Sequence, residues 1–545
     1  MVFNNLLSLI NNSYVFSKKR IRSLYLSSNI YNKKIIPSIV SSLEYYPSPN
    51  LLDSLIKYDK KKINIENYSL NKIWDNKELK EKDYKNLNSF FWLFSLDLRS
   101  SKKDTQNVIL QWIDKNHKYN SKSWEIDIVA KRIIAWTSNS RLTYEDSTSS
   151  YKNKFNSVIK KQINHLINEI EGSKWIGDKI IGCAAIILTG LSYKDKDKDW
   201  YLKTGLNLLK RFVKFSLDSN GFPKSRSISQ LCFYLKYFIL IREWFKESQS
   251  EIPDFINENI YYLGQAYVFS WQNNKVNLLF NGNNEAHNVD FDHYLKKFGY
   301  NFKNQGNELG GYVVLNNKKT TLTMDVGSSP DKKFSSNYQA GALSFEISSS
   351  GKKLICNSGY FQNHNQKLNR LSRSSAIHST LILDDRSSCR FDKTKNESSK
   401  VSCGLKILKK NIVFEKNYWK VNAAHDGYLK QYGIIHEREI EFYPEKIKFV
   451  GHDKIIYKNN IKNLKFEIRF HLEPNIKIMK TQDNKSVLIE LNGEGWRFNS
   501  NNYSINIDDG LYFGKKDSFV DNQNIVISGM TNDENQTIKW EITKL

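Results

Sequence analysis

The chain contains little cysteine, and this scarcity excludes two ways of holding a fold together. Only five of its 545 residues are cysteines, and none of them lies in a CxxC pair. Zinc modules need closely spaced ligands, and disulfide frameworks need many cysteines at short separations. We therefore expect reduced thiols, without a zinc knuckle or a disulfide framework. The five are Cys183, Cys232, Cys356, Cys389 and Cys403.

Long hydrophobic runs are missing too. No segment approaches the roughly 20 consecutive apolar residues that are needed to cross a bilayer. The first 26 residues hold short apolar patches broken by paired asparagines, without the continuous hydrophobic region or cleavage site of a secretory signal. These absences predict a protein without a transmembrane segment, located in the cytoplasm by default or at the periphery of a membrane.

Acidic residues are too few to balance the basic ones. The chain has 82 Lys and Arg against 57 Asp and Glu, for a formal net charge of +25. Such a charge favours a polyanionic partner, whether nucleic acid, anionic glycan or acidic membrane surface. The lysines are nevertheless spread along the whole chain, so part of the charge reflects composition. No helix-turn-helix, RNA-recognition or zinc-finger pattern accompanies it, so specific nucleic-acid binding is not predicted.

The chain has enough hydrophobic material for two domains, at 40% hydrophobic and 13% aromatic residues. Between residues 85 and 275 the apolar residues recur at helical spacing, as in WEIDIVAKRIIAW and GCAAIILTGL, with short polar turns between the segments. Consecutive helices of this kind suit helical hairpins that curl into an (α/α) toroid. A bundle or a solenoid fits the same pattern.

Helical periodicity stops in an Asn- and Gly-rich stretch, and the period afterwards is two, as in TTLTMDVG and SVLIELNG. Many short strands bounded by turn residues predict an antiparallel sandwich. The predicted fold is therefore α+β and multidomain. Its parts are a partly helical N-terminal extension (1–80), an incomplete (α/α) toroid (81–280), a linker (281–310) and a large antiparallel β-sandwich (311–545).

One stretch of the sandwich carries more polar chemistry than packing requires. It reads QAGALSFEISSSGKKLICNSG from Gln339, followed by RLSRSSAIHSTLILDD. The alternation indicates paired strands, with Arg370, Arg373 and His378 clustered around a third strand. In the same order, the heparinase II/III-like polysaccharide lyases have a small-Leu-Ser-Phe strand, an Asp/Asn-Ser-Gly turn and an Ala-His-Asn/Ser-Thr strand. The stretch resembles the C-terminal domain of that family.

Further motifs extend the resemblance over roughly residues 85 to 545. The helical half has the Phe-x-Trp-Leu helix of the family and its Trp, Arg and Trp, and the sandwich has four motifs of a subgroup. They are Phe90 to Leu93; Trp124, Arg132 and Trp136; HDGY at 425–428; HER at 436–438; RFHLEP at 469–474; and GEGWRF at 493–498.

The resemblance implies a helical toroid packed on a β-sandwich, with an anionic polysaccharide bound in the cleft between them. The implied reaction is β-elimination, in which the proton beside a uronate carboxylate is removed and the glycosidic oxygen leaves. It needs a group that neutralises the carboxylate, a base and an acid. Arg, His, Asn or Gln can neutralise, and Tyr or His can transfer protons.

On this basis the predicted catalytic residues are His378, Arg373, His425 and Tyr428. Each has a plainer interpretation, because a buried His is commonly satisfied by its neighbours and Asp-Gly is an ordinary hairpin turn. The predicted substrate contacts come from the turn before a helix, from positions where the family has His and Asp, and from the linker. They are Arg226, Lys224, Gln339, Asn357 and Asn284.

The sequence also departs from the family pattern. Gly177 and Asp178 stand where active members have a polar neutraliser, and Gln230 stands near the position of the catalytic Tyr. A shift of a few residues would instead place Tyr234 or Tyr338 at a catalytic position. Of the His/Asp/His set that binds a metal in some members only His378 remains, so neither zinc nor another cofactor is predicted.

Two hypotheses follow from these observations. The first is a lyase that acts on an acidic polysaccharide with a rearranged set of residues. The second is a descendant without catalysis that binds an anionic glycan. The resemblance also allows a periplasmic or cell-envelope location, and the sequence predicts no oligomeric state.

Overall fold

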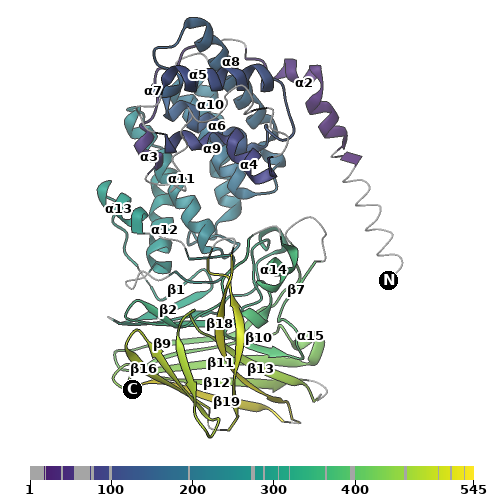
Figure 1. The fold of residues 1–545 in the computed structure, drawn as a ribbon, viewed down its shortest axis with the longest axis vertical. Helices are drawn as coiled ribbons and strands as arrows, with labels where there is room; N and C mark the ends of the chain where they lie inside the picture. The colour runs from purple at the N-terminus through teal and green to yellow at the C-terminus, as the bar shows by residue number, and fades with distance from the viewer. Residues whose placement is uncertain are drawn as a thin grey trace. The chain divides into compact units, whose positions relative to one another are not determined.

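The fold was obtained as a computed structural model, and it divides into two compact units (Figure 1). Unit 1 comprises Met1–Phe215 and Lys236–Ile260, and unit 2 comprises Ser216–Leu235 and Tyr261–Leu545. The structure describes residues 17–18, 20–37, 41–53, 74, 79–96, 101–193, 197–271, 277–285, 289–304, 306–317, 319–362, 365–392, 399–458, 463–500, 502–515, 518–532 and 534–545.

The described part of unit 1 is helical. Two of its helices begin at residues whose side chains cap them. Ser101 Oγ accepts a hydrogen bond from the Asp104 N–H at the start of α5, and Thr148 Oγ1 accepts one from the Tyr151 N–H at the start of α8. The α-helices are α2 (Asn29–Lys34), α3 (Pro49–Asp53), α4 (Glu81–Ser89), α5 (Lys102–Asn116), α6 (Ile126–Ser138), α7 (Ser140–Thr143), α8 (Ser149–Glu169), α9 (Ile176–Ser192) and α10 (Lys198–Ser216), with α11 (Ile228–Glu247) and α12 (Asp254–Ser270) shared between the units.

The Trp/Arg/Trp motif lies in the core of unit 1. Arg132 on α6 is fully buried and donates to the carbonyls of Asn88 (2.8 Å) and Ser123 (3.1 Å). Its guanidinium lies 4.0 Å from the centroid of the Trp112 ring. Burial lowers the pKa of Arg132 well below its usual value. The motif therefore joins helices through a buried cation, and it offers no surface group.

The strands of unit 2 form open antiparallel sheets. The five-stranded sheet has the order β1 (Glu308–Leu309), β2 (Tyr312–Asn316), β3 (Thr320–Asp325), β4 (Phe345–Ser349), β5 (Lys352–Ile355). The eight-stranded sheet has the order β14 (Lys477–Lys480), β15 (Ser486–Leu491), β16 (Glu494–Asn499), β19 (Gln536–Lys544), β12 (Lys448–Tyr457), β11 (Ile434–Tyr443), β10 (Trp419–His425), β9 (Ile407–Phe414).

A four-stranded sheet has the order β17 (Ile505–Tyr512), β18 (Val520–Met530), β13 (Lys465–His471), β6 (Leu381–Leu383), and β7 (Arg390–Phe391) pairs with β8 (Val401–Cys403). Short helices interrupt the strands: α13 (Val289–Lys297), α14 (Gln366–Leu371) and α15 (Leu429–Tyr432). The predicted order, helices followed by an antiparallel sandwich, is confirmed.

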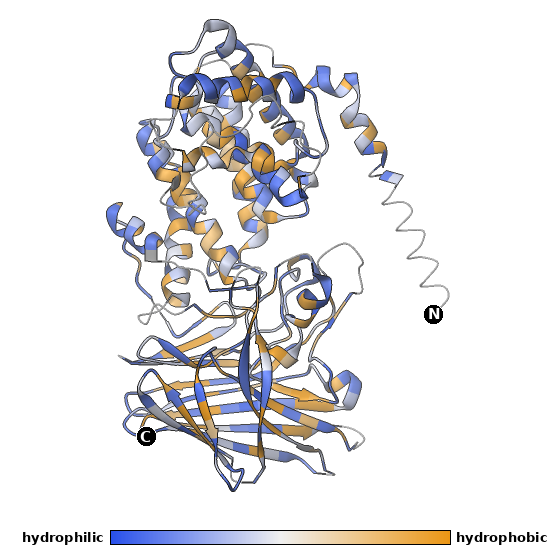
Figure 2. Cartoon of the chain, in the orientation of Figure 1, coloured by the Kyte–Doolittle hydropathy of each residue, from blue (hydrophilic) through white to orange (hydrophobic). Residues whose placement is uncertain are grey.

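The two-residue period decides which side chains enter the sandwich core. On β11, Ile440 and Phe442 are buried, whereas Glu439 and Glu441, which alternate with them, are partly exposed. Figure 2 shows both hydrophobic and hydrophilic segments along these strands. Aromatic rings fill the centre, where Phe345 of β4 stacks on Trp540 of β19 with ring centroids 5.2 Å apart. Each such ring contributes roughly 1.5–3 kcal/mol by burial.

The predicted helical half, residues 81–280, extends across both units. Residues 216–235, assigned to the helical half by their periodicity, belong to unit 2. The segment expected as a linker, 281–310, contains α13 and the whole of β1. Most of the predicted N-terminal extension lies outside the described residues. Among the described residues, none of the helices has the length and apolar character that a bilayer crossing requires.

Candidate functional site

The loop between α10 and α11 is a tight hairpin that belongs to unit 2. Asp218 Oδ1 accepts the backbone N–H groups of Asn220 and Phe222, each at 2.9 Å. Gly221 sits at φ +74°, a conformation that favours glycine. The NGFP turn seen in the sequence thus folds back on itself, and the hairpin presents Lys224 and Arg226.

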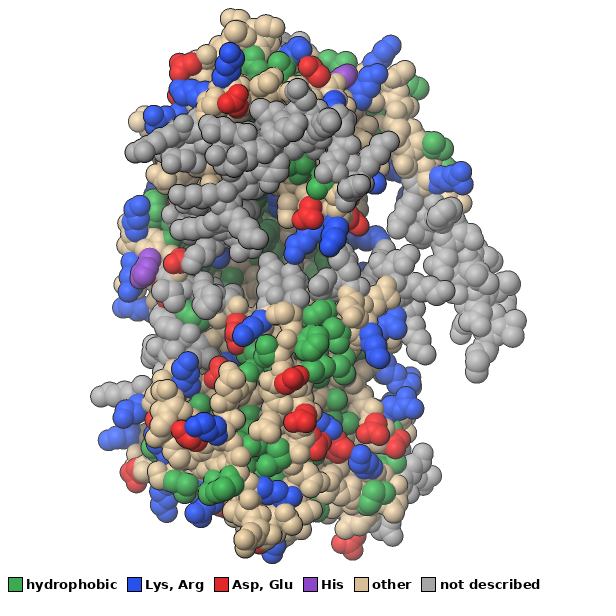
Figure 3. Space-filling model, viewed as in Figure 1, with side chains coloured by type: hydrophobic (Ala, Val, Ile, Leu, Met, Phe, Trp, Pro, Cys, Tyr) green, Lys and Arg blue, Asp and Glu red, His purple; other side chains and the backbone are tan. Residues whose placement is uncertain are grey.

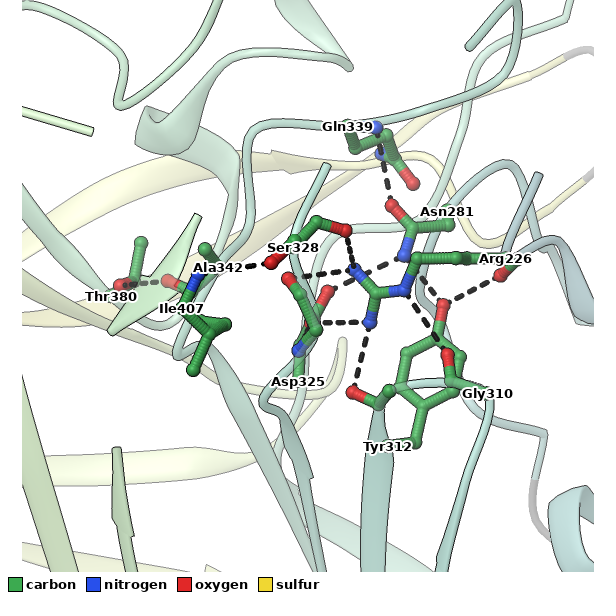
Figure 4. A network of polar contacts seen from close by, with 12 residues as sticks. Arg226, Asn281, Gly310, Tyr312, Asp325, Ser328, Gln339, Ala342, Thr380 and Ile407 are labelled. Carbon is green, nitrogen blue, oxygen red and sulfur yellow. Dashed lines mark hydrogen bonds and ion pairs between the residues drawn. The ribbon is translucent and has the colours of Figure 1, made fainter. Parts of the chain in front are cut away.

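Arg226 fastens this hairpin to the five-stranded sheet (Figure 4). Its side chain is buried, and its guanidinium donates to four carbonyls and one carboxylate. The acceptors are Gly310 O (3.1 Å), Gly311 O (2.9 Å), Gly327 O (3.1 Å), Ser328 O (3.3 Å) and Asp325 Oδ1 (2.6 Å). Since a guanidinium has five N–H donors, each of them can be occupied within the protein. Arg226, predicted as a substrate contact, is therefore a clamp.

Glycines make room for the clamp. A Cβ on Gly311 would lie 2.8 Å from Arg226 Nη2, and one on Gly327 would lie 2.3 Å from Arg226 Cζ. Arg226 itself adopts φ +61°, a left-handed conformation that non-glycine residues rarely hold. The surrounding bonds compensate for this strain, so the clamp fixes both the side chain and the backbone of the hairpin.

A cavity of about 560 Å³ lies beside the clamp, and all its lining residues belong to unit 2. The walls are the hairpin 218–226, the turn between β1 and β2, and the loop after β3. Lys224, a predicted substrate contact, is exposed and lines this cavity. This volume is within the roughly 300–1,000 Å³ of small-molecule sites. The cavity is thus large enough for a sugar unit.

Arg373 and His378 lie in a different environment from the one expected. Arg373 follows α14, and His378 lies between the short 3-10 helix Ser375–Ile377 and the strand β6. Both are only 1% exposed. Arg373 donates to the carbonyls of Tyr338 (2.8 Å) and Ser335 (2.9 Å). Burial lowers the pKa of Arg373 to about 10. Its cation is thus used to hold loops of the sandwich.

His378 keeps one ring nitrogen without a partner. Its Nδ1 lies 2.8 Å from the Ser374 carbonyl, which can only accept, so Nδ1 carries the proton and Nε2 the lone pair. Nε2 has no hydrogen-bond partner within the described residues. Burial lowers the pKa of His378 to about 4, so the ring is neutral near pH 7. A neutral imidazole with a lone pair is the form that a general base requires.

The HDGY and HER motifs meet in one buried network. His425 Nε2 lies 3.4 Å from His436 Nδ1, and His436 Nε2 lies 2.7 Å from Asp453 Oδ1. Arg438 holds the same carboxylate in two bonds of 2.8 and 3.0 Å. Burial lowers the pKa of His425 well below its usual value. The motifs therefore form an interior polar network of the sandwich.

Tyr428 belongs to the same interior. Its hydroxyl donates to the Leu381 carbonyl at 2.9 Å, and its side chain is 1% exposed. Burial raises the pKa of Tyr428 above its usual value. A tyrosine that transfers protons in elimination needs a lowered pKa, so this environment favours the structural interpretation of Tyr428.

The predicted amide contacts tie loops together. Gln339 is buried, donates to the Gly359 carbonyl at 2.9 Å and accepts from the Gly282 N–H at 3.0 Å. Asn357 Oδ1 accepts from the Ser379 N–H at 3.1 Å, and Asn284 Oδ1 accepts from the Tyr360 N–H at 3.2 Å. Asn284 is partly exposed, whereas Gln339 and Asn357 are fully buried. Of the three amides, only Asn284 reaches the surface.

The residues that replace the family's catalytic groups lie inside the hairpin, in the protein interior or in unit 1. Gln230 accepts from the Ser225 hydroxyl inside the hairpin, and Tyr234 and Tyr338 are buried. Burial raises the pKa of Asp178 in unit 1 to about 6. All five cysteines are free thiols. Within the described ranges, no group of three or more His, Cys, Asp and Glu is arranged to hold a metal ion.

Sequence reasoning found only Lys224 and Arg226 of the cavity lining. It missed Asp218, Glu308, Asp331 and Phe334, which also line the cavity. The signal that could have found Asp331 and Phe334 is the Gly-Ser-Ser-Pro-Asp run after β3, a loop at a strand end where binding residues are common. On the face shown in Figure 3, Lys and Arg side chains of the sandwich are interspersed with Asp and Glu, so the overall charge does not mark the site.

Comparison with known proteins extends these observations. Residues 307–541 match the family model described as Heparinase II/III-like, C-terminal. No curated protein matches the chain.

Solved structures match over nearly the whole chain. A heparinase III crystal structure has a TM-score of 0.68 at 16% identity, covering 94% of this chain and 86% of that one. A mutant of the heparan sulfate lyase HepC from Pedobacter heparinus has a TM-score of 0.66 at 14% identity, covering 89% and 79%. At these identities the likeness establishes the fold.

Proposed function

Because residues 307–541 belong to the heparinase II/III-like C-terminal domains, we propose that this protein is a polysaccharide lyase that cleaves a uronate-containing polysaccharide by β-elimination. The family match carries this proposal. It is supported by the net charge of +25, which would concentrate a polyanion near the protein.

The reaction needs a cation at the uronate carboxylate and a base near its α-proton. Lys224, exposed on the cavity wall, supplies the cation in this proposal. His378 supplies the base, because its ring is neutral and its Nε2 carries a lone pair without a partner in the described residues. Its Cδ2 lies 2.4 Å from the position that a Cβ on Gly341 would take, so glycine there allows the ring to pack directly against the backbone.

The decisive experiment is an absorbance assay for unsaturated uronates, run on heparan sulfate, hyaluronan, alginate and polygalacturonate. We expect product from at least one of them. His378→Gln should lower turnover by about 10²–10⁴, the usual contribution of a general base. The exposed His293 offers a matched control, so His293→Gln should leave turnover unchanged. An active protein that is indifferent to His378→Gln would exclude His378 as the base.

Lys224 has a separate expected effect on binding. Lys224→Ala removes one cation from the cavity wall, so we expect affinity for the acidic polysaccharide to fall by roughly threefold to tenfold, with a shallower salt dependence. Titration calorimetry at several salt concentrations measures both quantities. The control is Lys319→Ala, at an exposed lysine in the β2–β3 turn. Equal losses in the two variants would assign the effect to general charge.

A second function is binding without catalysis, and one observation favours it. The four predicted catalytic side chains, His378, Arg373, His425 and Tyr428, are each about 1% exposed. Gln230 also stands near the position where the family has its catalytic tyrosine, and an amide cannot transfer protons. Retention of an acidic polysaccharide without any unsaturated product would identify this second function.

A further inference from the structure

Residues 20–36 of unit 1, here called the basic segment, expose large apolar side chains. Residues 20–27 are helical, and α2 continues the segment after a cap in which Ser28 accepts from the Tyr31 N–H. Single exposed apolar residues are ordinary on a protein surface, but several within one short segment indicate a binding surface. The exposed apolar side chains are Ile21 (67%), Leu24 (67%), Ile30 (74%) and Ile36 (58%).

The charge of the basic segment has a single sign. The segment contains no Asp or Glu, and Arg20, Lys33 and Lys34 are exposed. On a helix, residues three or four apart lie on one face, so Arg20 shares a face with Leu24. For the same reason Lys33 and Lys34 share a face with Ile30. Figure 2 shows hydrophobic and hydrophilic residues next to one another along this segment. The exposed surface therefore combines cations with aliphatic side chains.

The opposite surface of the basic segment is fastened to the helices of unit 1. Tyr31 and Ile35 are buried. The Tyr31 hydroxyl lies 2.7 Å from His165 Nδ1 on α8, and the Asn164 side-chain amide of the same helix donates to the Ile35 carbonyl at 3.0 Å. These bonds hold the segment in place, so its exposed surface is presented before any partner arrives and little ordering would accompany binding.

The combination of cations and aliphatic side chains distinguishes between possible partners. A polyanionic glycan or a nucleic acid would pair with the cations but leave the aliphatic side chains in water. A second copy of the chain would bring one basic surface against another, and like charges repel. An anionic bilayer offers phosphates to the cations and an acyl region to the aliphatic side chains, which is how basic amphipathic helices bind membrane surfaces.

We propose that the basic segment docks the protein on an anionic phospholipid surface. Its exposed apolar side chains enter the boundary between headgroups and acyl chains, and Arg20, Lys33 and Lys34 contact the lipid phosphates. This inference goes beyond the proposed function and does not depend on it. It places the protein at a membrane surface, where it would meet polymers that are attached to or pass through that membrane.

The test is sedimentation of the full chain with vesicles of phosphatidylcholine alone and of phosphatidylcholine with an equal amount of phosphatidylglycerol. We expect binding to the anionic vesicles, weakened by salt, and much less binding to the neutral ones. Leu24→Ser with Ile30→Ser should weaken the affinity at least about tenfold, because two large apolar side chains no longer leave water. Lys33→Ala with Lys34→Ala should weaken it roughly tenfold to thirtyfold, at about fivefold for each lysine near an anionic surface.

Two control pairs lie on unit 2 and remove the same kinds of side chain. Met479→Ser with Met530→Ser removes two apolar side chains that are 62% and 54% exposed, and Lys319→Ala with Lys352→Ala removes two exposed lysines. Both pairs should leave the vesicle affinity unchanged. Equal losses in the control pairs and in the pairs of the basic segment would overturn the proposal.

Three further outcomes would also overturn it. One is no binding to anionic vesicles, and another is equal binding to neutral vesicles. The third is binding that depends on Lys33 and Lys34 but is indifferent to Leu24→Ser with Ile30→Ser, since that result would assign the segment to a polyanion. Failure of the elimination assay would leave the proposal standing, because vesicle sedimentation measures association alone. An active lyase that ignores vesicles would remove the membrane surface and keep the proposed function.

Discussion

Lowering the pH from 7 to 4.5 should destabilise unit 2 by several kcal/mol, and the loss should begin near pH 6.5, above the range in which ordinary carboxylates are protonated. The cause is a set of buried histidines held neutral inside the sandwich. Burial lowers the pKa of His378 to about 4 and that of His471 to about 3, and it also lowers the pKa of His425 and His436.

The sign follows from proton binding. An unfolded histidine titrates near pH 6.5, so between that value and the folded pKa the unfolded chain binds protons that the folded chain excludes. Stability from these groups is therefore complete above about pH 6.5 and is lost as the pH falls toward 4. For His378 and His471 the loss is on the order of 3 kcal/mol each.

Urea unfolding at intervals between pH 8 and 4.5 measures this slope. His471→Gln keeps a donor for the Ala376 carbonyl and an acceptor for the Ser358 hydroxyl, so it should flatten the pH dependence without unfolding the protein. His293→Gln, at an exposed histidine, serves as the control. An unfolding free energy that stays constant from pH 7 to 4.5 would contradict the prediction.

Removing the Arg226 cation should be the most damaging single substitution near the cavity. Arg226→Met leaves the carboxylate of Asp325 buried without its cation and withdraws donors from four carbonyls. Breaking a buried ion pair on one side costs about 3–5 kcal/mol. Arg226→Lys should recover only part of this, because an ammonium group cannot reach the same acceptors as a planar guanidinium.

Urea unfolding also measures this effect, and the companion variant is the double substitution Arg226→Met with Asp325→Asn. Because that change removes the uncompensated charge, the double variant should be more stable than Arg226→Met alone. The exposed pair Arg211–Glu171 offers the control, and Arg211→Met should cost less than about 1 kcal/mol. A cost for Arg226→Met as small as that of Arg211→Met would show that the clamp does not hold the hairpin.

The sequence predicted the class of fold because local periodicity follows directly from backbone geometry. Apolar spacing of 3.6 is typical of helices such as α6 and α9, and alternation is typical of strands such as β11. The ordered motifs around Leu343–Phe345 and His378 also predicted the resemblance to the C-terminal domain of the family, and the match of residues 307–541 to the model of that domain confirms it. Whether a residue lies on a strand or on a helix could thus be predicted from neighbours a few residues away.

The roles of individual polar residues depended on contacts between distant segments. Arg226 finds its acceptors 84 to 102 residues further along the chain, and Arg373 finds carbonyls 35 and 38 residues earlier. Spacing alone cannot say whether such a cation meets substrate or a buried carbonyl. The sequence by itself therefore determined the architecture and the kinds of polar side chain that a site could use. The tertiary structure decided which of these side chains are buried and paired, because burial and pairing depend on segments that meet only on folding.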